Sequence, residues 1–316
     1  KASAGRVLPE LKKRIHTVLN GIDTQIYHAV DPTPVFQRYA LDPAVSQIIL
    51  HPHRPEAGKG LIQTILVVEK LVKIYGFTHL RVLVPQWLGE MNGQSESEFH
   101  AQISAELQRR GLEEHFIFHQ WLSQDEMPEY YSAASLTLCL GSVVEAFGNV
   151  AYESLACGTP SIVAKVGVHR SQLPDTLIDK VEYGNVDAAA QIAATILREH
   201  IRVRGERLEQ ILNYFSLENQ LEAYAHIITQ AEKLPRLESK TITISPETKF
   251  HLAPWCYLAT RGIYHDYHAK YYPIPKLEAW LAESDTLSFT EKEGRSILWD
   301  EMQQWYRMGI LVPLTD

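Results

Sequence analysis

Residues 135–164 of this 316-residue chain, SLTLCLGSVVEAFGNVAYESLACGTPSIVA, carry the clearest indication of its fold. An apolar, strand-like run at 135–140 leads through a glycine-containing loop into a helical stretch at 150–156, and a second apolar run follows at 161–164. Gly158 is well placed to end the helix, because glycine tolerates the left-handed backbone common at helix ends. Strand, helix and strand within so short a stretch are typical of a parallel sheet with crossover helices.

The same alternation continues on both sides of this stretch. Short apolar runs predict strands, and longer runs with apolar residues three and four apart predict helices. Strands are expected at 46–50, 80–84 and 116–119, and helices at 60–75, 95–110, 124–134, 186–200 and 216–232. We therefore predict an α/β fold with an open, mostly parallel, Rossmann-like sheet covered on both faces. Such sheets bind ligands at the carboxyl ends of their strands, so the loops there are the first place to look for a site.

A polar, proline-containing link, KLPRLESKTITISPETK at 233–249, indicates a domain boundary. We predict the sheet domain at 23–235 and a small α+β accessory domain at 236–316. Residues 1–22 form a first segment, which the family resemblance given below implies to be a hinge and remnant of a preceding domain. The helix expected at 291–306 and the strand-like run after it are reminiscent of a winged-helix module. Because the chain starts with Lys rather than Met, we expect it to be a piece of a longer protein.

Composition narrows the function. With 30 basic and 38 acidic residues the net charge is −8, which argues against broad nucleic-acid binding. Three scattered cysteines do not suggest a disulfide framework or a zinc site, so Cys139 and Cys157 are interpreted as small buried side chains in a reducing, cytoplasmic protein. No apolar run reaches the roughly 20 residues of a membrane-spanning helix, and we expect at most peripheral membrane association. For the accessory domain we favour protein or peptide docking.

The first candidate loop is HPHRPEAGKG at 51–60, between an expected strand and an expected helix. Arg54 and Lys59, with a glycine on each side of the lysine, suit a diphosphate that also meets the positive end of the helix. The spacing is not that of an ATP-hydrolysing P-loop. The alternative is a solvated basic loop, in which His51 and His53 are ordinary polar residues.

The second candidate loop follows the run at 135–140. Glu153, on the expected helix, could accept hydrogen bonds from two adjacent ribose hydroxyls, and Glu145, in the loop, could accept from sugar hydroxyls. Backbone amides at the start of the helix could meet a sugar or phosphate oxygen. These amides belong to Phe147, Gly148 and Asn149. The alternatives are an exposed loop acid at 145 and a surface helical residue at 153.

Together these stretches resemble a known family. EAFGNVAYESLACGTPSIVA at 145–164 resembles the E-x7-E signature of the family 4 retaining glycosyltransferases, which have the GT-B fold. HRPEAGKG at 53–60 is similar to the family's GRLVPEKG loop and keeps its Arg and Lys, with His in place of the leading Gly. Weaker similarities lie in order around them, in VLNGID at 18–23, HQWLSQDEMPEYYSAA at 119–134 and NYFS at 213–216.

The resemblance implies a binding scheme. Arg54 and Lys59 would hold the diphosphate of a UDP- or GDP-linked sugar, Glu153 its ribose, and Glu145 with the amides at 147–149 the transferred sugar. Arg54, Lys59 and Glu145 would also act in catalysis, with retention of configuration and without a bound metal or other cofactor. The acceptor would be held by an N-terminal domain preceding residue 1, so this fragment alone is expected to be inactive.

One loop departs from the family pattern. The family often has Gly-Gly and a nearby Glu where this chain has VGVHR at 166–170, which leaves the donor sugar open. We interpret His169 and Arg170 as part of a surface turn, with contact to the donor as the alternative. Two other functions remain compatible with the sequence: a non-catalytic sugar-nucleotide-binding or partner-docking protein on the same fold, and a sugar-nucleotide epimerase of related shape.

Overall fold

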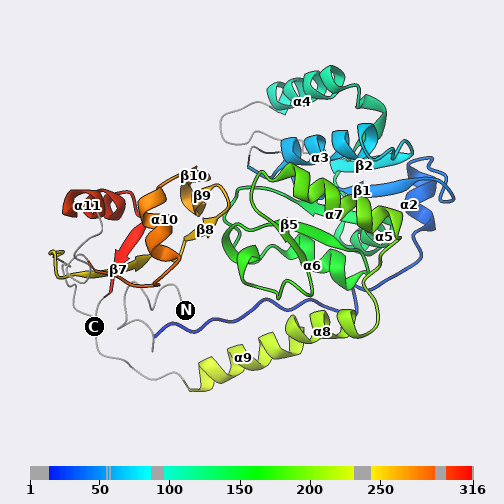
Figure 1. The fold of residues 1–316 in the computed structure, drawn as a ribbon. Helices are drawn as coiled ribbons and strands as arrows, with labels where there is room; N and C mark the ends of the chain where they lie inside the picture. The colour runs from blue at the N-terminus through cyan, green and yellow to red at the C-terminus, as the bar shows by residue number, and fades with distance from the viewer. Residues whose placement is uncertain are drawn as a thin grey trace. The chain divides into compact units, whose positions relative to one another are not determined.

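The computed structural model describes residues 14–54, 56, 58–86, 96–230, 243–288 and 297–314. Tertiary contacts divide the chain into two compact units (Figure 1). The larger unit spans residues 19–221, and the smaller one includes the described residues from 243 onward. The segment boundaries expected from the sequence, at residues 22 and 235, stay a prediction.

The larger unit is built on a six-stranded parallel sheet with the order β3-β2-β1-β4-β5-β6 (Figure 1). All of its pairings are parallel, and at its centre Ile49 of β1 lies opposite Val82 of β2 and Leu136 of β4. The strands are β1 (Gln47–Leu50), β2 (Leu80–Pro85), β3 (Phe116–His119), β4 (Leu136–Cys139), β5 (Ser161–Ala164) and β6 (Asp179–Val181). The predicted α/β class with a Rossmann-like parallel sheet is confirmed.

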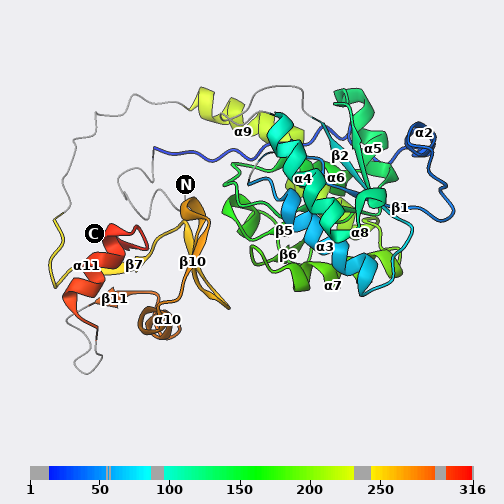
Figure 2. The ribbon, with the colours of Figure 1, turned by 90° about the horizontal axis from the view of Figure 1, so that it is seen from above.

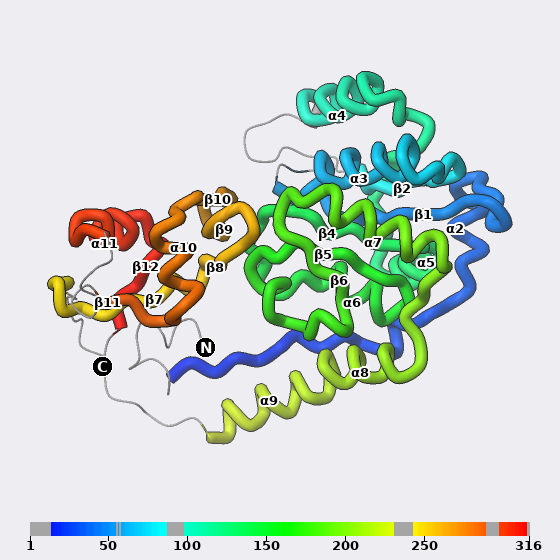
Figure 3. The backbone as a smooth tube through the Cα atoms, viewed as in Figure 1, coloured from blue at the N-terminus to red at the C-terminus, as the bar shows by residue number. Residues whose placement is uncertain are grey.

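Helices cover both faces of this sheet, and Figure 3 follows the chain through each crossover. They are α2 (Thr33–Arg38), α3 (Leu61–Lys73), α4 (Glu96–Arg110), α5 (Met127–Ala133), α6 (Asn149–Ala156), α7 (Val186–Arg198) and α8 (Glu206–Tyr214), and α9 (Leu217–Thr229), which buries no residue, follows α8 in the chain. Ile48 and Leu50 belong to the core shared with α5, α6 and α8, whereas Ile49 belongs to the core shared with α3, α4 and α7 (Figure 2). This alternation is the period of a strand buried on both faces.

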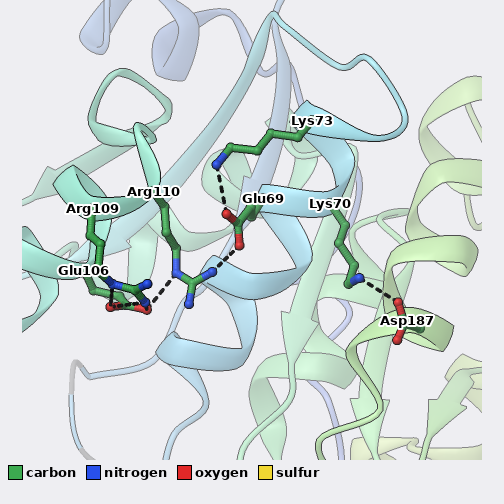
Figure 4. A network of polar contacts seen from close by, with 7 residues as sticks. All are labelled: Glu69, Lys70, Lys73, Glu106, Arg109, Arg110 and Asp187. Atoms are coloured by element: carbon green, nitrogen blue, oxygen red, sulfur yellow. Dashed lines mark hydrogen bonds and ion pairs between the residues drawn. The ribbon is translucent and has the colours of Figure 1, made fainter.

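Charged residues on α3 are paired within the fold rather than gathered for a ligand. Figure 4 shows Glu69 of α3 accepting hydrogen bonds from Lys73 and from Arg110 of α4. Lys70 pairs with Asp187 of α7 at 2.7 Å. Lys73 and Asp187 are exposed, so their pairs contribute little to stability, whereas Arg110 is only 16% exposed where it pairs with Glu69.

The smaller unit holds two three-stranded antiparallel sheets, ordered β10-β9-β8 and β11-β7-β12. Buried Phe250, Trp280, Met302 and Trp305 form its core. Its strands are β7 (Lys249–Leu252), β8 (Cys256–Ala259), β9 (Gly262–His265), β10 (Lys270–Tyr272), β11 (Leu287–Ser288) and β12 (Leu311–Pro313), and its helices are α10 (Pro275–Leu281) and α11 (Trp299–Arg307). The start of the helix expected at 291–306 lies outside the described residues, and the comparison with a winged-helix module stays a prediction.

Two expectations from composition can be compared with the described part of the chain. Cys139 and Cys157 are both buried, as predicted. Within the described ranges, no helix is both long enough and apolar enough to cross a membrane.

Candidate functional site

The two candidate loops lie against each other, because β1 and β4 are neighbours in the sheet. The amide of Ser142 donates a hydrogen bond to the carbonyl of Gly58, with 2.8 Å between N and O. A Cβ atom on Gly60 would lie 2.6 Å from the amide nitrogen of Gly141, and Gly60 has a φ of +91°. Only glycine at position 60 tolerates both this backbone and this close approach. The glycines beside Lys59 therefore do more than form a turn, since they allow the loops to touch.

The contact between the loops brings Lys59 and Glu145 together. Lys59 Nζ lies 2.5 Å from Glu145 Oε1, and the two side chains are only 21% and 29% exposed. Lys59 was expected to bind the diphosphate of a ligand and Glu145 its sugar. In this structure the two side chains bind each other. An anion that reaches Lys59 has to compete with Glu145.

Arg54 lies on the other side of the same loop. Its guanidinium carbon is 5.8 Å from the centroid of the Trp121 ring, in the range of a cation–π contact. Trp121 itself lines a cavity beside the strand ends, so Arg54 is placed at the rim of that cavity.

Two histidines, His53 and His169, lie near the Lys59–Glu145 pair, and a third, His51, lies against His53. Burial lowers the pKa of His51 to about 3, and that of His169 to about 4. The pKa of His53 is also lowered well below its ordinary value, first by burial and then by the nearby His51 and Lys59. These imidazoles are therefore neutral near pH 7, and they act there as dipoles and hydrogen-bonding groups rather than as cations.

The interpretation of His169 as part of a surface turn is wrong. The 3₁₀ turn Gly167–Arg170 folds inward, His169 is only 7% exposed, and its Nδ1 lies 3.1 Å from the hydroxyl of Tyr152. Space for the ring comes from Gly148, because a Cβ there would lie 2.2 Å from His169 Cε1. The glycine that precedes α6 thus makes room for a histidine from the loop after β5.

Gly148 also sets the start of α6. Its φ of +81° is left-handed, and the helix begins at the next residue, Asn149. The backbone amides at 147–149 lie at the start of α6, where an anion is favoured. The side chain of Phe147 packs on Tyr152 and Phe215, so that residue can offer a ligand only its backbone.

Glu153, one turn into α6, lies in a different environment from Glu145. The hydroxyl of Tyr131 donates a hydrogen bond to Glu153 Oε2 at 3.0 Å, and Tyr27 and Asn149 lie near this carboxylate. Burial raises the pKa of Glu153, and these three polar neighbours oppose the rise. The alternative of a plain surface residue does not describe this position. Sequence reasoning did not assign Tyr27 or Tyr131 to the site, although Tyr131 stands in the stretch 119–134 that carried the resemblance.

A cavity of about 320 Å³ opens beside Glu153. Tyr27, Tyr131, Asn149 and Glu153 form its polar end. Most of the remaining wall is apolar or aromatic: Pro52, Pro85, His119, Trp121, Leu122, Gln124, Met127, Tyr130 and Val150. Its volume lies at the lower end of the range of small-molecule sites, and an apolar wall with a few directed polar groups is typical of them.

The family model described as glycosyl transferases group 1 matches residues 41–210. Among curated relatives, D-inositol 3-phosphate glycosyltransferase of Acidothermus cellulolyticus is 30% identical over 155 residues, which are 49% of this chain and 34% of that protein. The protein of the same name from Kribbella flavida is 33% identical over 106 residues, 33% of this chain and 24% of the relative. The matches thus cover only about a quarter to a third of these relatives' length.

Solved structures show the same fold. Sucrose-phosphate synthase from Thermosynechococcus elongatus aligns with a TM-score of 0.58 at 20% identity, over 70% of this chain and 55% of that chain. HepE of Anabaena, solved in complex with UDP, aligns with a TM-score of 0.59 at 19% identity, over 68% of this chain and 57% of that one.

Proposed function

This chain belongs to the group 1 glycosyl transferases, and from that membership we propose that it is the donor-binding half of a retaining GT-B enzyme. The observation that carries the proposal is the meeting of two loops at the carboxyl ends of β1 and β4, with Lys59 touching Glu145. The cavity that Glu153 lines is also lined by Pro52 of the first loop and by Asn149 at the start of α6, just after the second loop. A cationic centre next to a pocket for a ring and its hydroxyls fits a nucleoside diphosphate.

We assign each residue a part of the donor. The aromatic and apolar wall of the cavity takes the base, Glu153 takes the ribose hydroxyls, and Lys59 with Arg54 takes the diphosphate. The amides at the start of α6 and Glu145 then face the transferred sugar. This assignment follows the order of groups along a nucleotide sugar.

Binding and chemistry would both depend on the Lys59–Glu145 pair. A donor diphosphate that displaces Glu145 from Lys59 gains a cation and releases a carboxylate toward the sugar hydroxyls. As the bond to the sugar breaks, negative charge grows on the leaving diphosphate, and Lys59 and Arg54 would stabilise it there. These cations would do what a metal ion does in other transferases, so we expect the reaction to need no metal or further cofactor.

The whole enzyme needs an acceptor, which we assign to an N-terminal domain preceding residue 1. We favour a uridine donor over a guanosine donor, because the structural relative HepE binds UDP, and we place the reaction in the cytoplasm. Retention of configuration rests on the E-x7-E pattern formed by Glu145 and Glu153.

Calorimetric titration of this chain with UDP, GDP and ADP tests the proposal. One nucleotide should bind selectively, and Lys59→Ala together with Arg54→Ala should weaken it about 100-fold by removing two charge-assisted contacts. Lys73→Ala, which removes a cation from the outer face of α3, serves as the matched control and should leave the affinity unchanged. If neither this chain nor a full-length protein with an upstream domain binds any of the three, the proposal is wrong.

A further inference from the structure

We infer that Tyr27 and Tyr131 are positioning residues that orient the Glu153 carboxylate toward the two ribose hydroxyls and so make the site selective for ribonucleotides over 2′-deoxyribonucleotides. The inference rests on the proposed function, because it takes Glu153 as the ribose-binding group. It goes further by naming the side chains that set the direction of that carboxylate and the discrimination that follows from it.

Tyr131 is held rigidly, so the direction of its hydroxyl is fixed. Its side chain is fully buried at the end of α5, and its carbonyl accepts a hydrogen bond of 2.7 Å from Thr159 Oγ1. The ring packs beside Tyr130 and Tyr27, with centroids 6.1 and 6.3 Å away. From this fixed position its hydroxyl meets Glu153 Oε2 at 3.0 Å.

Tyr27 reaches the same carboxylate from a different part of the chain. Its amide donates a hydrogen bond of 2.8 Å to the carbonyl of Asp23, and its side chain is 9% exposed. The phenol lines the same cavity as Gln124 and Glu153. Burial, reinforced by the charge of Glu153, raises the pKa of Tyr27 to about 12, so the phenol stays protonated beside this carboxylate.

These contacts matter because a carboxylate withdrawn from water is costly unless donors compensate it. The Tyr131 phenol, held by packing, supplies such a donor, and together with the Tyr27 ring beside it we expect it to fix the plane of the carboxylate before a ligand arrives. The two adjacent ribose hydroxyls then bind a carboxylate that is already oriented, so binding costs no further free energy to orient it. This is the general benefit of preorganisation. Without the phenols, the carboxylate would rotate within the cavity, and it would discriminate less between a ribonucleotide and a 2′-deoxyribonucleotide.

The test compares ribo- and deoxyribonucleotides on variants that keep the ring packing. Titrations of wild type, Tyr131→Phe and Tyr27→Phe use UDP against 2′-deoxy-UDP, with GDP against 2′-deoxy-GDP in parallel. We expect the wild type to prefer the ribonucleotide about tenfold, as one charge-assisted hydrogen bond predicts. Each variant should lose most of this preference by binding the ribonucleotide more weakly, while its affinity for the deoxy form changes little. Tyr75→Phe, which removes a hydroxyl on the opposite face of the sheet, should keep the full preference.

The outcomes separate the two claims. Equal weakening of both nucleotides in the Tyr→Phe variants would mean that the tyrosines only support the fold, and this overturns the inference while the proposed function stands. An unchanged preference in both variants also overturns it. If the wild type binds none of the four nucleotides, either as this chain or as a full-length protein with an upstream domain, the proposed function itself is contradicted, and the inference fails with it.

Discussion

Glu145, in the loop before α6, and Glu153, on α6, are eight residues apart, yet their surroundings in the fold differ. Glu145 is paired with a cation, Lys59, across two loops. Glu153 accepts a hydrogen bond from the neutral Tyr131, lies near Tyr27 and Asn149, and lines a cavity. Lys59 can leave Glu145 and bind an anionic ligand instead. Among the described residues no cation pairs with Glu153, so its negative charge is available to the hydroxyls of a ligand. The difference suggests that the phosphate side of the site rearranges on binding and the ribose side does not.

The largest effect is expected at Gly148, which lies between the two carboxylates. In Gly148→Ala the Cβ would lie 2.2 Å from His169, on a backbone with φ of +81°. We expect a loss of about 3 kcal/mol in the free energy of unfolding, measured by urea titration, and loss of nucleotide binding. Gly76 is the matched control, because its φ is +79° but nothing lies within 4 Å of an added Cβ.

Gly76→Ala should therefore cost only the backbone strain, about 1 kcal/mol. Similar losses in the two variants would mean that the ring of His169 moves aside easily, and that the buried histidine does not tie the two halves of the site together.

The second prediction tests the contrast between the two carboxylates directly. Glu153→Gln should weaken UDP binding about 100-fold, because an amide replaces a charged acceptor that the ribose needs. Glu145→Gln should leave UDP binding equal or a few-fold tighter, since Lys59 no longer has an ionic competitor and UDP carries no sugar for Glu145 to hold. Calorimetry on both variants measures this. Weaker UDP binding in Glu145→Gln would contradict the exchange of partners at Lys59.

The parallel sheet could be predicted because its strands are short apolar runs between glycines and polar loops. Ile48, Ile49 and Leu50 already show a strand buried on both faces. The position of the candidate loops could be predicted too, since the carboxyl ends of parallel strands share one edge. The order of the strands could not, because periodicity describes one element and not its neighbours.

The sequence did not predict which side chains contact each other. Lys59 and Glu145 are 86 residues apart in the sequence, and their contact depends on how Gly58 and Gly60 let two loops touch. The burial of His169 depends on a missing Cβ at Gly148, which no local pattern around 166–170 reveals. Tyr27 was overlooked for the same reason, because its link to Glu153 exists only once the chain is folded.

The last effect concerns acid, and it acts on the phosphate side through His169. Burial lowers the pKa of folded His169 to about 4 against an ordinary value of 6.5, with Lys180 and Lys59 adding to the shift and Glu145 opposing it. Between these two values the unfolded chain binds a proton that the folded chain does not, so stability falls as the pH drops from 6.5 to about 4 and this contribution changes no further below that. The expected slope from this residue is about 1.4 kcal/mol per pH unit. Urea titrations of wild type and His169→Gln at several pH values measure it, and the variant should lose stability less steeply. An identical slope in both proteins would mean that His169 is protonated as readily in the folded chain as in the unfolded one, and that the phosphate side is less closely packed than its burial indicates.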